Sequence, residues 1–79
     1  MTLLRDLSGA ELAKALSRID YRITRHTRSH LRITLDIPPH HHITPAHDSL
    51  KVGTLSAILW DVVGNLKISR EDLTRRLFG

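Results

Sequence analysis

A run in the middle of the chain, residues 30–37, alternates strictly between polar and apolar side chains. Because successive side chains of a strand point to opposite faces of a sheet, this run predicts a strand with one buried face. The expected buried face carries Leu31, Ile33, Leu35 and Ile37. The opposite face carries His30, Arg32, Thr34 and Asp36. Such a strand needs both neighbouring strands and a layer that covers its apolar face.

The flanking residues supply candidate neighbours on both sides of this strand. Residues 21–24 also alternate, and a turn is expected at 27–28. Residues 38–39 are both proline, which ends a strand in a turn, and Ile43 indicates a brief third strand that stops at Pro45. The pattern therefore predicts a three-stranded antiparallel meander.

Helices are expected before and after the meander. Ser8 and Glu11 form an S-x-x-E capping box, which predicts a helix start at this point. Apolar residues at helical spacing predict a second helix over 55–66, with a break near 64–65 where the chain has Gly-Asn. Ser69 is the expected cap of a short third helix. The fold class is thus α+β, with the helices on one face of the sheet.

The 79 residues are enough for one core, so residues 1–79 are interpreted as a single domain. A hydrophobic share of 41% supports one layer of helices on a sheet but no deep internal cavity, so a surface site is expected. The chain has no cysteine, which excludes disulfides and thiolate chemistry. Residues 1–7 are too short an apolar run for an export signal, and no run is long enough to span a membrane. We therefore expect a cytoplasmic protein.

The positive charge of the chain is concentrated in one segment. The formal net charge is +4, and residues 18–32 hold five arginines against the single acid Asp20, so the rest of the chain is neutral. Clustered arginine suits phosphate, because the guanidinium fork matches its oxygens. The alternative is a solvated basic face without a ligand.

His30 and Arg32 are expected to project together from the face of the sheet that the helices leave open. Arg22, Thr24 and His26 would join them if Tyr21 and Ile23 point inward. A histidine titrates near neutrality, and arginines stabilise the charge on a phosphorane, so this set fits RNA cleavage. The alternative is an exposed strand histidine without a chemical role.

The run of histidines at 40–42, with His47 beyond it, suggests a metal site at first sight. Adjacent strand residues point to opposite faces, so His41 and His42 are poorly placed to share one ion, and no cysteine or nearby glutamate completes a site. We therefore expect a solvated turn and no metal or other cofactor. His47 stays a candidate auxiliary residue of the active site.

Trp60 lies off the main apolar stripe of the second predicted helix. It is interpreted either as a half-buried residue at the core edge or as a contact for a protein partner, since tryptophan is common in interface hot spots.

Residues 54–77 also fit a helix-turn-helix that binds DNA. Glu71 and Asp72 count against this alternative, because they would repel DNA near the start of its second helix.

Five blocks give the chain a resemblance to a known family. They are Ser8-Gly9-Ala10-Glu11-Leu12, Arg25-His26-Thr27-Arg28-Ser29-His30, His41-His42-Ile43-Thr44-Pro45-Ala46-His47, Gly53-Thr54-Leu55-Ser56-Ala57-Ile58-Leu59 and Ile68-Ser69-Arg70-Glu71-Asp72-Leu73. In order and spacing they resemble the HicA (YcfA-like) toxins of bacterial toxin-antitoxin pairs, from Ser8 to Phe78.

The resemblance implies a double-stranded-RNA-binding-like fold, metal-independent cleavage of messenger RNA, and neutralisation by a HicB-type antitoxin. It identifies His30 as the catalytic histidine of the family's G-S-H motif, in which the glycine is Arg28 here. We accordingly expect His30 to act as general acid or base. Four residues are expected to bind RNA: Arg25, Arg28, Ser29 and Arg32. A noncatalytic RNA-binding relative is the nearest alternative.

Overall fold

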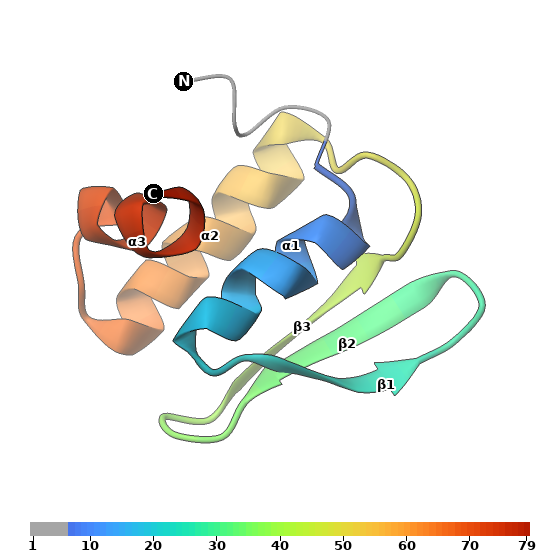
Figure 1. Ribbon diagram of the computed structural model, residues 1–79, viewed down its shortest axis with the longest axis horizontal. Helices are drawn as coiled ribbons and strands as arrows, with labels where there is room; N and C mark the ends of the chain where they lie inside the picture. The colour runs from blue at the N-terminus through green and yellow to red at the C-terminus, as the bar shows by residue number, and fades with distance from the viewer. Residues whose placement is uncertain (1–6) are drawn as a thin grey trace.

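The computed structural model describes residues 7–79, which form one layer of helices on an antiparallel sheet (Figure 1). The elements in chain order are α1 (Gly9–Leu16), the 3-10 turn η1 (Ser17–Ile19), β1 (Arg22–His26), β2 (His30–Leu35), β3 (His40–Pro45), α2 (Val52–Leu66) and α3 (Arg70–Phe78). The predicted α+β class and the helix, three-strand, helix, helix order are confirmed.

β2 is the central strand of the sheet, between β1 and β3. Its side chains at Leu31, Ile33 and Leu35 are buried under the helices, as predicted. α1 packs against β1 and β2, while α2 packs against β3, so all the described helices lie on one face of the sheet (Figure 1). The opposite face of the sheet is left open by residues 7–79.

The start of α1 is held tightly to the end of β3. Ser8 forms the predicted capping box, because its side chain accepts from the Glu11 backbone and the Glu11 carboxylate accepts from the Ser8 backbone. A Cβ atom at Gly9 would overlap the carbonyl oxygen of Pro45, so only glycine allows this close approach. The N-terminal turn of α1 thereby fixes the end of β3 that pairs with the first residue of β2.

β1 differs from the prediction at its C-terminal half. The pairing register with β2 shifts between Ile23 and Arg25, which places Ile23 opposite Ile33 and His26 opposite Leu31. Cross-strand partners point to the same face, so His26 lies on the helix side and not beside His30. Ile23 also faces this side but is 49% exposed, because the helix layer does not fully cover β1.

Ile37 and the end of α2 also differ from the predictions. Ile37 was expected in the core, but β2 ends at Leu35 and Ile37 lies in the following turn with 87% of its surface exposed. α2 continues through Gly64 to Leu66 and is capped by Lys67, which has a left-handed φ of 56°. Burial of its apolar stripe outweighs the weak helix propensity of glycine at an exposed position.

α3 begins as predicted at Ser69, whose hydroxyl accepts from the Asp72 backbone at 3.0 Å. No helix within the described chain has both the length and the apolar character needed to cross a bilayer. The expectation that residues 1–7 carry no export signal falls largely on residues 1–6, which lie outside the described part.

Candidate nucleic-acid interface and active site

A pocket on the open face of the sheet contains His30. It has a volume of about 240 Å³ and is lined by Arg25, Thr27, His30, Leu31, Arg32 and Ile43. Three strands contribute to it, because the register places Arg25 and then Ile43 opposite Arg32 on either side of β2. The structure therefore brings three of the predicted site residues, His30, Arg25 and Arg32, into one concave surface.

Arg25 and Arg32 carry a concentrated positive charge at this pocket. They are directly opposite each other on neighbouring strands, an arrangement of like charges that destabilises a sheet. Within residues 7–79 neither has a carboxylate partner, whereas Arg22 forms a 3.0 Å ion pair with Asp36. Unneutralised paired arginines are the expected composition of an anion site.

The backbone of His30 is fixed by the preceding turn. The Thr27 hydroxyl oxygen lies 3.2 Å from the backbone nitrogen of His30, and the Thr27 backbone nitrogen donates to the His30 carbonyl at 3.0 Å. Ser29 accepts from the backbone of Ala46 at 2.8 Å, which ties the turn to the end of β3. These contacts leave the exposed imidazole of His30 on a rigid strand end.

Arg28 is exposed in the turn between β1 and β2, where the resembled family has glycine. Among the described residues other than glycine, only Asp20 and Lys67 have a positive φ. Arg28 therefore occupies an ordinary backbone conformation, and the replacement of glycine introduces no backbone strain here. Arg28 does not line the pocket; it extends the basic surface along the turn.

His47 and Trp60 lie outside the pocket. His47 is exposed in the loop after β3, two residues beyond Pro45, the cross-strand partner of His30. Trp60 is 56% exposed on α2, and the guanidinium carbon of Arg70 lies 5.1 Å from the centre of its ring. Trp60 therefore belongs to the helical layer, and the sheet separates it from His30.

The histidine run divides between the two faces of the sheet. His41 pairs with Thr34 on the open face, while His40 and His42 point toward α2. The rings of His40 and His42 are edge to face at 4.6 Å, and Nδ1 of His40 lies 2.7 Å from the Tyr21 hydroxyl. In residues 7–79 no group of three or more histidine, cysteine, aspartate or glutamate side chains is arranged to hold a metal ion.

Burial lowers the pKa of both His40 and His42 below its ordinary value of about 6.5. The neighbouring His40 also lowers the pKa of His42, and His41 lowers the pKa of both residues, whereas Asp61 on α2 raises both pKa values. Nε2 of His42 is buried without a hydrogen-bond partner in the described chain. The seam between β3 and α2, which holds His40 and His42, therefore favours neutral imidazole rings.

We expect the protein to lose stability as the pH falls below about 6.5, because the unfolded chain binds protons at His40 and His42 more readily than the folded chain. The free energy of unfolding, measured in urea from about pH 5 to 8, should therefore rise with pH. His42→Gln should weaken this dependence, whereas His47→Asn, a control outside the seam, should keep it. An equal pH dependence in His42→Gln and the wild type would contradict the assignment.

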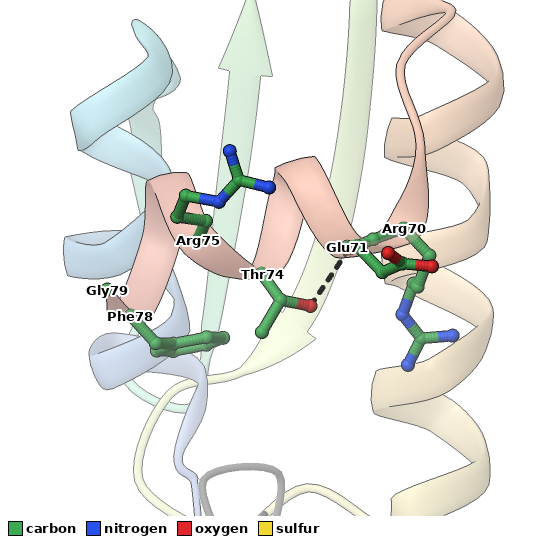
Figure 2. A pocket seen from close by; sticks show the side chains of 6 residues that line it. All are labelled: Arg70, Glu71, Thr74, Arg75, Phe78 and Gly79. Atoms are coloured by element: carbon green, nitrogen blue, oxygen red, sulfur yellow. Dashed lines mark hydrogen bonds between the residues drawn. The ribbon is translucent and has the colours of Figure 1, made fainter.

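A second pocket, of about 340 Å³, lies along α3 (Figure 2). It is lined by Arg70, Glu71, Thr74, Arg75, Phe78 and Gly79. The Thr74 hydroxyl donates to the Arg70 carbonyl at 2.9 Å and is thus already used within the helix. This lining contains no histidine, in contrast to the pocket at His30.

Three residues that line the pocket were not predicted from the sequence as site residues: Thr27, Leu31 and Ile43. Leu31 was expected only in the core. Thr27 was interpreted only as part of a turn, although its contacts with the His30 backbone join residues three positions apart and are of the kind that a threonine hydroxyl makes locally. Ile43 could have been found, because counting outward from the turn at Ile37 and Pro38 pairs it with Arg32.

Comparison with known proteins adds no further constraint on this site. No family model, curated protein or solved structure matches the chain.

Proposed function

We propose that this chain is an endoribonuclease in which His30 transfers a proton during cleavage of the RNA backbone. The observation that carries the proposal is the pocket on the open sheet face, where His30 shares one lining with Arg25 and Arg32. An imidazole that can accept or donate a proton, placed beside two guanidinium groups without carboxylate partners in residues 7–79, suits a phosphodiester better than a neutral substrate.

The chemistry needs two proton movements. The attacking oxygen, either the 2′-hydroxyl or water, loses a proton as it bonds to phosphorus. The 5′ oxygen gains one as its bond to phosphorus breaks. His30 performs one or both of these transfers, and Arg25 and Arg32 stabilise the negative charge on the phosphorane. Arg28, at the adjacent turn, binds a neighbouring phosphate.

The resemblance to HicA toxins supports a role as the toxin of a toxin-antitoxin pair with a double-stranded-RNA-binding-like fold. A HicB-type antitoxin would then inhibit by covering Arg25, Arg28 and Arg32 with acidic side chains, which steer association and exclude RNA. Trp60 lies across the sheet from these arginines, so it contacts the antitoxin only if that partner also reaches the helical layer.

Two rival functions are weaker. A noncatalytic RNA-binding domain would use the same arginines but gives no role to His30. A helix-turn-helix DNA binder would use α3, yet its Asp72 already forms ion pairs with Arg75 and Arg76 at 3.8 and 3.1 Å. Those arginines are partly neutralised, unlike Arg25 and Arg32 on the open face.

The proposal is tested by incubating the purified protein with a fluorogenic single-stranded RNA. We expect cleavage to persist in excess chelator, because the residues at His30 supply proton transfer and charge stabilisation themselves. Activity that is lost with chelator and restored specifically by zinc would contradict this mechanism and move attention to the histidine run at 40–42.

A further inference from the structure

The hydroxyl of Ser29 contacts the imidazole of His30 directly. Its Oγ lies 2.9 Å from Nδ1 of His30, within hydrogen-bond distance. The backbone on both sides of this contact is fixed, by Thr27 at the His30 nitrogen and by Ala46 at the Ser29 carbonyl. The contact therefore joins two residues whose relative position is set by the fold.

We infer that Ser29 is a positioning residue that holds His30 in the tautomer with its proton on Nδ1, leaving Nε2 to exchange protons with RNA. This inference rests on the proposed function. The 2.9 Å contact fits a hydroxyl that donates to Nδ1 as well as one that accepts from it. Only acceptance also serves the imidazolium, in which both ring nitrogens carry a proton. One hydrogen bond thus keeps the same ring orientation while Nε2 gains and loses a proton.

This role differs from the phosphate contact that the sequence suggested for Ser29. A hydroxyl that accepts from Nδ1 is engaged with His30 before RNA arrives. Direct phosphate binding then falls to the three arginines around the turn, Arg25, Arg28 and Arg32. The two roles make different kinetic predictions, because loss of a phosphate contact raises KM, whereas loss of imidazole orientation lowers kcat.

The tautomer is measured on the RNA-free protein by long-range ¹H–¹⁵N NMR of labelled histidines, above the pH at which they are protonated. We expect Ser29→Ala to lower the ratio of Nδ1–H to Nε2–H tautomer at His30 by about two- to tenfold, the range that one ordinary hydrogen bond supplies. Ser29→Thr, which keeps a hydroxyl, should restore the ratio. His26, an exposed histidine on the neighbouring strand, is the internal reference.

An unchanged tautomer ratio at His30 in Ser29→Ala would overturn the inference. So would a rise in KM at constant kcat in Ser29→Ala, since that pattern belongs to a phosphate contact. The expected kinetic result is a fall in kcat of about two- to tenfold with little change in KM.

Failure of the proposed function has a separate signature. In that case His30→Ala would cleave RNA as fast as the wild type, while the tautomer shift in Ser29→Ala would still be observed. The NMR measurement therefore tests the contact, and the His30 variant tests the chemistry.

Discussion

Replacement of His30 by alanine should slow RNA cleavage by about a hundred- to ten-thousand-fold, the usual contribution of general acid or base catalysis. The fold should survive the substitution, because Thr27 bonds to the backbone of His30 and the imidazole itself is exposed. Cleavage is measured with the fluorogenic RNA, and folding is measured by the midpoint of urea unfolding.

His26→Ala is the matched control for this experiment. His26 is an exposed histidine on the adjacent strand, but the register shift in β1 turns it to the helix side of the sheet. It should therefore retain activity near the wild-type rate. A folded His30→Ala protein that still cleaves RNA at the wild-type rate would refute the catalytic role, whereas inactivity together with unfolding would point to a structural one.

The starts of α1 and α3 and the central strand were predictable because they depend on residues that are close in sequence. The Ser8 and Glu11 capping box and the Ser69 cap each involve partners three positions apart. Likewise, the alternation from Leu31 to Leu35 follows directly from the pleat of a strand, so the pattern of buried side chains needed no tertiary information.

The side chains that share the pocket with His30 were less predictable, because they depend on the pairing register of the strands. A one-residue shift reverses which side chains share a face. The irregularity between Ile23 and Arg25 therefore exchanges His26 for Arg25 on the open face, and nothing local in residues 22–26 indicates it. The continuation of α2 through Gly64 is similar, since tertiary packing outweighs a local propensity there.

Removal of the opposed arginines, Arg25 and Arg32, should have the second large effect, on RNA affinity. Replacing both Arg25 and Arg32 by alanine should weaken RNA binding by about a hundredfold at low salt, because each charge-assisted contact contributes at least about tenfold. The slope of log affinity against log salt should decrease by about 1.4, since each phosphate contact on a single strand contributes about 0.7. Fluorescence anisotropy in a His30→Ala background measures both quantities without cleaving the RNA.

If Arg25 and Arg32 form a specific site, the loss of RNA affinity should exceed the loss caused by removing any other two positive charges. Lys14→Ala with Lys51→Ala removes the same charge from exposed positions in or next to the helices, and it should change affinity much less. Arg25→Lys with Arg32→Lys should keep most of the salt dependence but lose affinity, because an ammonium does not match the guanidinium fork. Equal affinities for the arginine and lysine double alanine variants would reject the open face as the RNA site.

Stability should move in the opposite direction from binding in the arginine variant. Arg25 and Arg32 are cross-strand partners with like charge, so their removal relieves repulsion within the sheet and should leave the free energy of unfolding equal or higher. A surface that binds RNA at a cost to its own sheet is typical of a functional site. If the variant instead loses stability and RNA affinity together, the arginines support the fold and the weakened binding follows from partial unfolding.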